Sequence, residues 1–115
     1  MRDDQWHYLT GTTDGNIGKV YVDGILEDSI DVTANISSQS GWPLYIGNGN
    51  HSNVSEYFPG LVDEVQIWST ALTQSEITAL YNSGTALDAR TNSGDYASTD
   101  NLVGYWKMED GSGTT

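Results

Sequence analysis

The chain has 115 residues, enough for one small domain, and its 16 acidic residues face only four basic ones, which gives a formal net charge of −12. Such a charge disfavours binding to a nucleic-acid backbone or to an anionic membrane surface. No cysteine is present, which excludes disulfides and thiolate chemistry. No apolar run approaches the length of a membrane span, and the N-terminal residues lack the apolar core of a signal peptide.

The first third of the chain is expected to form strands. Residues 5–13 alternate with the two-residue period of a strand, and residues 18–24 alternate again after a polar turn. Asp23-Gly24 is a strong hairpin signal, because glycine tolerates a positive φ. Residues 25–33 are therefore predicted to return as the partner strand.

The middle of the chain mixes short apolar runs with a polar segment. Residues 42–47 predict a short strand, with Pro43 at its start, where a missing N–H is tolerated. Residues 48–57 are rich in asparagine and predict a polar loop. Residues 60–68 are mostly apolar and predict a buried strand.

The period then changes to that of a helix, which is predicted within residues 72–84. Thr73 at the N-cap and Glu76 three residues later form a capping box. Leu72 and Ile77 stand where a hydrophobic staple would place them, and the glycine at position 84 is placed to end the helix. So short a helix is marginal alone and must dock on a sheet.

The last part of the chain has linker composition over residues 85–101, and a strand follows at 102–108. Many short strands, glycine-rich turns and one late helix predict an all-β fold, an antiparallel β-sandwich. The strands number about six, whereas jelly-roll sandwiches have roughly eight or more. A complete jelly roll would therefore need further strands.

Two stretches resemble a known family. They are similar to the end and the middle of a LamG-like jelly-roll module, of the concanavalin A-like lectin/glucanase superfamily. The closing motif of that module is matched by Gly60, Val62, Asp63, Glu64, Val65, Ile67, Ala71, Leu72, Glu76, Ile77, Leu80 and Tyr81. The Trp-His strand and the Tyr-Val-Asp-Gly hairpin of its middle are matched within residues 6–24.

The tail resembles the opening strand of such a module, through Val103, Tyr105, Trp106, Glu109, Asp110, Gly111, Ser112 and Gly113. The resemblance thus implies a partial or permuted jelly roll. Residues 1–84 would be the C-terminal half of one module, 85–101 a linker, and 102–115 the first strand of the next. The chain would be either a piece of a tandem-repeat protein or a short protein of its own.

The tail strand is expected to pair with residues 61–68 and to cover an apolar edge. Alternation would place Tyr105 on one face and Trp106 on the other, with Trp106 reaching the core. Pairing with a neighbouring chain is the alternative, and we expect a homodimer formed by strand exchange rather than a monomer.

No enzyme is expected. Glucanases of the superfamily carry two carboxylates that alternate along one strand, so that both point into the cleft. Here Asp63 and Glu64 are adjacent, which would send them to opposite faces, and Glu27-Asp28 has the same defect. His7 lies in no Ser-His-Asp order and is expected to be a packing or edge residue.

The loop at 48–57 is the candidate binding site. Asn48, Asn50, His51 and Asn53 place many polar groups together, with aromatic Trp42 and Tyr57 beside them. An exposed aromatic ring beside amides suits a sugar, although a solvated turn and a core role for Trp42 remain alternatives.

Calcium is the only cofactor considered, because it prefers oxygen ligands. Its candidate ligands are Asn48, Asn50 and Glu56, and the single acid makes this set weak. The glycosylation sequons at Asn35, Asn50 and Asn53 matter only in a eukaryotic source.

The function expected is that of a non-catalytic extracellular recognition or adhesion module of a bacterial surface protein, with a glycan or another surface protein as its partner. The first alternative is a structural spacer or self-association repeat. A less favoured one is an accessory part of a glycoside hydrolase. The parent protein is expected outside the cell or at its surface, without nucleic-acid binding or membrane insertion.

Overall fold

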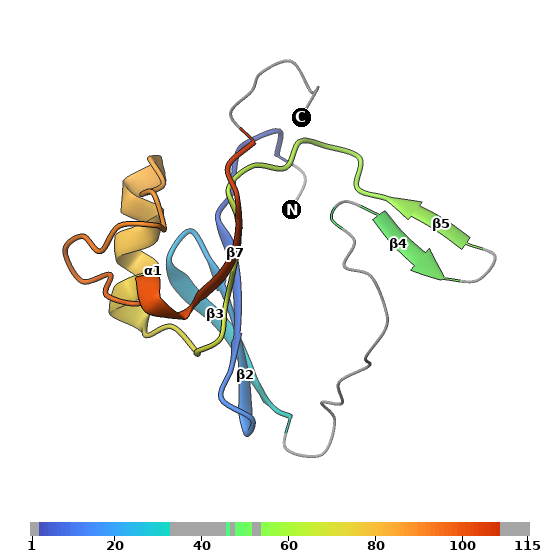
Figure 1. The fold of residues 1–115 in the computed structure, drawn as a ribbon. Coiled ribbons are helices and arrows are strands. Elements are labelled where there is room, and N and C mark those ends of the chain that lie inside the picture. Colours follow the sequence, from blue (N-terminus) through green and yellow to red (C-terminus); the bar gives the residue numbers. More distant parts are fainter. Residues whose placement is uncertain (1–2, 33–45, 47, 52–53, 109–115) are drawn as a thin grey trace.

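A computed structural model describes residues 3–32, 46, 48–51 and 54–108 (Figure 1). The described strands pair only in antiparallel ladders, and α1 is a single short helix, so the all-β class is confirmed. The strands are β1 Leu9–Thr13, β2 Ile17–Val22, β3 Ile25–Asp31, β4 Asn48–His51, β5 Val54–Tyr57, β6 Val65–Trp68 and β7 Leu102–Trp106. The helix is α1 Gln74–Tyr81, and short 3₁₀ turns cover Asn82–Gly84 and Thr99–Asn101.

Strands β1, β2 and β3 form a meander with β2 in the centre. The β2–β3 turn is Asp23-Gly24, whose φ angles are 51° and 79°, as the predicted tight hairpin requires. The register between β2 and β3 shifts next to Tyr21, where Glu27 is the extra residue of a bulge. Tyr21 on one face of this sheet is buried, whereas Val20 on the other face is 52% exposed.

Helix α1 begins as the sequence predicts. The Glu76 N–H donates to Thr73 Oγ1 at 3.1 Å, and the Thr73 N–H donates to Glu76 Oε1 at 3.3 Å. The staple residues Leu72 and Ile77 are both buried. The helix ends earlier than expected, because Asn82, not Gly84, takes the left-handed conformation at its C-cap.

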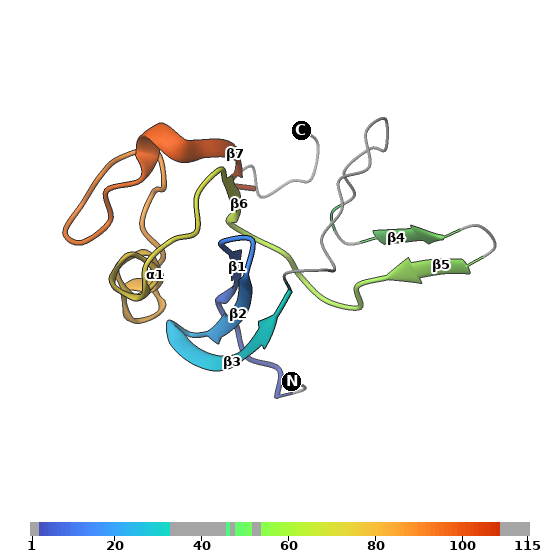
Figure 2. The same cartoon turned by 90° about the horizontal axis from the view of Figure 1, so that it is seen from below.

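The helix docks on the β2–β3 turn, beside one face of the meander (Figure 2). Gln74 Nε2 donates to the carbonyl oxygen of Gly24 at 2.6 Å. A Cβ added to Gly24 would make only an ordinary contact with Thr78 Cα, at 3.5 Å, so it is the positive φ of 79° and not a lack of space that favours glycine there. The core lies at this junction and contains Tyr21, Leu72, Ile77, Leu80, Ala89 and Tyr96.

Strand β7 pairs antiparallel with β6, with Val65 opposite Trp106 and Gln66 opposite Tyr105. The predicted pairing of the tail strand is therefore confirmed within one chain. The prediction that Trp106 reaches the core was wrong. Trp106 is 39% exposed, whereas Tyr105 packs against the core. The reason is that the core lies on the Tyr105 side of this ladder, a direction that alternation alone does not give.

Residues 85–101 were predicted to be a linker from their polar composition, and two of them, Ala89 and Tyr96, belong to the core. Ala89 and Tyr96 are fully buried. The hydroxyl of Tyr96 donates to the carbonyl oxygen of Ala89 at 2.8 Å and accepts from Trp68 Nε1 at 2.9 Å. These two buried residues attach the segment to the core, although most of its other residues are polar and lower its mean hydropathy. The assignment of residues 1–84 and 102–115 to successive modules stays a prediction.

Glu76 ties this segment to the start of α1. Its Oε2 accepts a hydrogen bond from the Ala97 N–H at 3.2 Å and another from the Ser98 hydroxyl. Burial raises the pKa of Glu76, but the hydrogen bonds outweigh burial, so its pKa lies below the usual value. One carboxylate thus caps the helix and anchors the segment that follows it.

Two predicted strands are shorter than expected. The strand predicted at 60–68 is confined to β6, and Leu61 is 77% exposed. Glu64 has a φ of 53°, which a β-strand cannot accommodate, so the ladder starts one residue later. Likewise, β1 begins only at Leu9, and Trp6 before it is 65% exposed.

The segment 48–57 was predicted to be a loop, yet its described residues form the β4–β5 hairpin. Figures 1 and 2 both show this hairpin projecting away from the meander and α1. Asparagine and glycine disfavour strands only weakly, so a ladder can override their composition.

Candidate functional site

The sequence-predicted binding residues fall on the β4–β5 hairpin or outside the described residues. Trp42 and Asn53 lie outside them. Asn48, Asn50 and His51 belong to β4, and Glu56 and Tyr57 belong to β5. The register pairs Asn48 with Tyr57, Gly49 with Glu56, and His51 with Val54.

This register separates the proposed calcium ligands. Paired positions alternate between the two faces of a ladder, so Asn48 and Asn50 share one face and Glu56 takes a position on the other. In the described part of the chain, no cluster of three or more His, Asp or Glu residues could hold a metal ion. Calcium binding at this hairpin stays a prediction.

A hollow elsewhere brings together residues that are far apart in the sequence. It has a volume of about 360 Å³ and lies between the residues before β1, those before β6 and the end of α1. Trp6, His7, Tyr8, Asp63, Glu64 and Tyr81 are among the residues that line it. Sequence reasoning noticed the Trp-His and Asp-Glu pairs but missed that they meet.

His7 fixes the rim of this hollow through two carboxylates. Its Nδ1 lies 2.9 Å from Asp23 Oδ2, and its Nε2 lies 2.8 Å from Asp3 Oδ2. The hydrogen bond to Asp23, followed by that to Asp3, raises the pKa of His7 above its usual value. The Tyr8 N–H also donates to Asp23 Oδ1, at 2.9 Å, and this bond is the largest cause of the lowered pKa of Asp23.

A chain of side-chain hydrogen bonds joins Tyr8 and Glu64, which both line the hollow. The Tyr8 hydroxyl donates to Gln66 Oε1 at 2.9 Å, and Gln66 Nε2 lies 3.4 Å from Glu64 Oε2. The Tyr105 hydroxyl donates to the same Glu64 oxygen. Burial, more than the charge of Glu64, raises the pKa of Tyr8 and Tyr105, so both phenols are hydrogen-bond donors at neutral pH.

Aromatic rings supply the apolar part of the hollow. The rings of Tyr8 and Tyr81 stack with their centroids 6.2 Å apart and their planes inclined by 28°. Trp6 stands at the opening with 65% of its surface exposed. A flat exposed indole beside carboxylate oxygens can hold a polyhydroxylated ring by contact with its C–H face and by accepting its hydroxyl protons.

Asp63 and Glu64 were expected to lie on the strand predicted at 60–68, but in the structure they precede β6. Both line the hollow, because Glu64 has a positive φ and precedes β6. Asp63 Oδ1 accepts the Glu64 N–H at 2.9 Å, and Glu64 accepts from the Tyr105 hydroxyl, so both carboxylates form hydrogen bonds within the chain. These bonds give the pair a positioning role in the loop.

Comparison with known proteins agrees with this fold. The sequence profile of the concanavalin A-like lectin/glucanases superfamily matches residues 1–78. The chain belongs to this superfamily. The match contains the β1–β2–β3 meander, β6 and the start of α1, so the resemblance inferred from the sequence is confirmed.

One solved structure shares the fold over most of this chain. It is a crystal structure of an S-layer domain-containing protein from Clostridium thermocellum, with 22% sequence identity and a TM-score of 0.56. The alignment covers 70% of this chain and 41% of that one. A comparison with curated proteins gave no match. Among the described residues, no helix is long and apolar enough to cross a membrane.

Proposed function

We propose that this chain is a non-catalytic recognition module of a surface protein and that it binds carbohydrate in the hollow beside Trp6. The observation that carries the proposal is the exposed indole of Trp6 at the opening of a hollow that also contains Asp63 and Glu64. Rings of this kind lose little conformational entropy on binding, because tryptophan has only two side-chain torsions.

The chemistry of the hollow favours a neutral sugar. A net charge of −12 repels acidic glycans, and the carboxylates at the hollow accept hydrogen bonds from hydroxyl groups. The Asp3–His7–Asp23 bonds hold the residue next to Trp6 in place before any ligand binds. Such preorganisation reduces the entropy lost on binding.

Non-catalytic binding is supported by the bonds of the two acids. Glu64 is fixed by Tyr105 and Gln66, and Asp63 is bonded to the neighbouring N–H. A glycosidase needs one carboxyl group free to donate a proton and a second free to attack or to activate water. A surface location is supported by the S-layer domain-containing protein that shares the fold.

An array of neutral oligosaccharides tests the proposal. The wild-type chain is applied first, and its best ligand is then titrated against Trp6→Ala and against Trp106→Ala, a control at another exposed tryptophan on β7. Trp6→Ala should weaken binding at least tenfold, since truncating a tryptophan that anchors a binding site costs about 2 kcal/mol or more. The Trp106 variant should bind like the wild type. Absence of any ligand, or equal binding by both variants, would contradict the proposal.

A further inference from the structure

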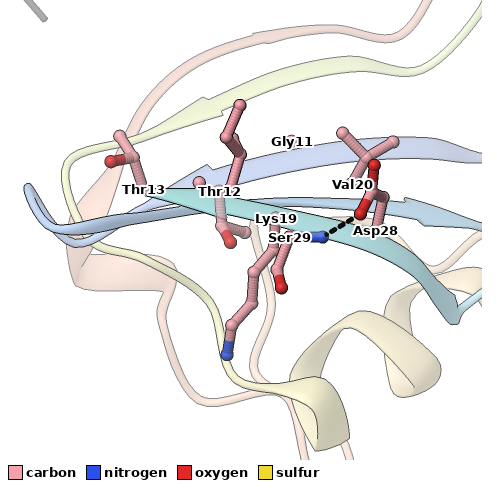
Figure 3. A pocket seen from close by; sticks show the side chains of 9 residues that line it. Gly11, Thr12, Thr13, Lys19, Val20, Asp28 and Ser29 are labelled. Atoms are coloured by element: carbon pink, nitrogen blue, oxygen red, sulfur yellow. Dashed lines mark hydrogen bonds between the residues drawn. The ribbon is translucent and has the colours of Figure 1, made fainter. Parts of the chain in front are cut away.

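In the described part of the chain, the face of the β1–β2–β3 meander that points away from α1 is apolar and exposed. The register places on this face residues that alternate with buried Tyr21. Its large members are Leu9, Val20, Ile25 and Ile30, which are 64%, 52%, 64% and 66% exposed. Figure 3 shows Val20 and Asp28 on this side of the sheet and Lys19 on the other. Contiguous apolar faces of this kind are rare on monomers and mark interaction surfaces.

The two outer strands of this face differ in bulk. On β1 the outward positions after Leu9 are Gly11 and Thr13, which are small. A Cβ added to Gly11 would meet no atom within 4 Å. A shallow hollow of about 340 Å³ is lined by residues of all three strands, among them Gly11, Thr13, Val20 and Ile30. Figure 3 shows Gly11, Thr13 and Val20 beside this hollow. On β3 the outward positions are large.

A two-fold axis parallel to β2 would match these surfaces. It lays β3 of one copy over β1 of the other, so that Ile30 enters the hollow over Gly11 and Thr13 of its partner. Ile25 then lies over Leu9, and Val20 meets Val20 near the axis. Such a self-complementary contact is what an isologous interface requires, with each patch serving both copies.

Charge selects this axis over the other one in the plane of the sheet. An axis perpendicular to the strands would place Asp28 over Asp28, and two like charges in a closing interface repel. The axis parallel to β2 places Asp28 over Gly11, which carries no charge. Among the positions that the register pairs on this face, Asp28 is the one ionisable residue, although the chain as a whole is strongly acidic.

We propose that a second copy of this chain docks face to face on the meander, related by a two-fold axis parallel to β2. The two meanders then form the aligned two-layer packing of a β-sandwich. Strand β7 remains paired with β6 of its own chain, so this dimer needs no strand exchange. The inference is independent of carbohydrate binding, because it uses none of the residues at the hollow beside Trp6.

The size of the face predicts a weak dimer. Three strands about 4.8 Å apart and about six residues long span roughly 14 Å by 20 Å. Two such faces bury less than the roughly 1,200 Å² of a standard stable interface. The mass in solution should therefore rise from monomer to dimer over the micromolar to millimolar range, and more readily at moderate salt than at low salt, because salt screens the repulsion between two acidic chains.

Sedimentation equilibrium of the full chain tests the dimer. Ile30→Glu places a charge in the centre of the contact, and Val103→Glu places the same charge on β7, where Val103 is 69% exposed. The first variant should weaken dimerisation at least tenfold, and the second should leave it unchanged. Far-ultraviolet circular dichroism verifies that both variants fold. A wild-type chain that stays monomeric at millimolar concentration, or a dimer insensitive to Ile30→Glu, would overturn the proposal.

Cross-linking tests the axis. The chain has no native cysteine, so Val20→Cys introduces a single thiol, with Val103→Cys as the control. Facing sheets are about 10 Å apart, which a short bis-maleimide spans and a disulfide does not. Val20→Cys should give a covalent dimer in high yield, and Val103→Cys should not. Equal yields would mean that β2 does not lie on the axis.

Discussion

His7 and Asp23 join the start of the chain to the β2–β3 turn, with Nδ1 of the imidazole 2.9 Å from Oδ2 of the carboxylate. Asp23 has a φ of 51°, so its side chain turns back toward the residues before β1 and also accepts the Tyr8 N–H. This bond therefore places Trp6, the neighbour of His7, at the opening of the hollow.

The stability gained from this bond should depend on pH. Because the folded pKa of His7 is raised, its contribution is fully present below the unfolded histidine pKa of about 6.5 and is lost as pH rises through the folded value. Because the folded pKa values of Asp3 and Asp23 are lowered, their contribution is present above about 3.8 and is lost at lower pH. The stabilisation by these bonds is therefore greatest between about pH 3.8 and about pH 6.5.

Thermal unfolding of His7→Gln across this pH range checks the prediction. The melting temperature of the wild type should exceed that of the variant near pH 5.5, and the gap should narrow as the solution becomes alkaline. His51→Gln, at the other histidine of the chain, is the control. A gap that is constant with pH would show that His7 acts through packing alone.

The contribution of the α1 capping box to the free energy of unfolding should be measurable with a single substitution. Thr73→Ala leaves the Glu76 N–H without its acceptor and should lower the free energy of unfolding by about 1 kcal/mol. Leu80→Ala empties a buried site and should lower it by roughly 2–5 kcal/mol. Thr70→Ala, at an exposed position before the helix, should change little. Urea titration measures the free energy of unfolding of all three variants. If Thr73→Ala and Leu80→Ala lowered it as little as Thr70→Ala does, the helix would not be docked on the core.

Strand β7 should be required for the fold. A chain that ends at residue 101 lacks the partner of β6 and the core contact of Tyr105, so it should unfold without a cooperative transition or precipitate. A chain that ends at residue 108 retains both and serves as the control. Circular dichroism during heating distinguishes them. A sharp, unshifted transition in the shorter chain would show that β7 is dispensable.

Tyr96 should matter through its hydroxyl. Tyr96→Phe keeps the buried ring but leaves Trp68 Nε1 without its acceptor and the Ala89 carbonyl without its donor. Unfolding should then require about 1–3 kcal/mol less free energy. Tyr81→Phe is the matched control, since the Tyr81 hydroxyl makes no hydrogen bond within the described part of the chain. A loss of the same size in both variants would assign the effect to the rings.

The candidate site could be predicted only in part from the sequence. The adjacent acids 63–64 and the Trp-His pair were visible as motifs, but Tyr8 and Gln66 are 58 positions apart, and no pattern in the sequence indicates that they bond. The asparagine-rich segment 48–57 was predicted to be the binding site because its polar residues lie close together in the sequence. Composition detects such local clusters and misses a site assembled from separate elements.

What the sequence determined by itself is the local structure. Thr73 and Glu76 are three residues apart and Asp23-Gly24 are adjacent, so their hydrogen bonds and φ angles depend on few neighbours. The closing motif of the superfamily is likewise a continuous stretch, and it fixed the fold class. In each case the residues that interact are close along the chain, and so the sequence pattern is enough.

What only the tertiary structure decided is which side each element turns to the core. Alternation along β7 puts Tyr105 and Trp106 on opposite faces. Tyr105 is the one that packs against the core, because the core lies on its side of the β6–β7 ladder. Polar residues around Ala89 and Tyr96 suggested a linker, whereas contacts with α1 and β6 buried both side chains. Burial depends on which distant segments pack together, and that choice is made by the whole chain because the apolar surface removed from water is shared between elements.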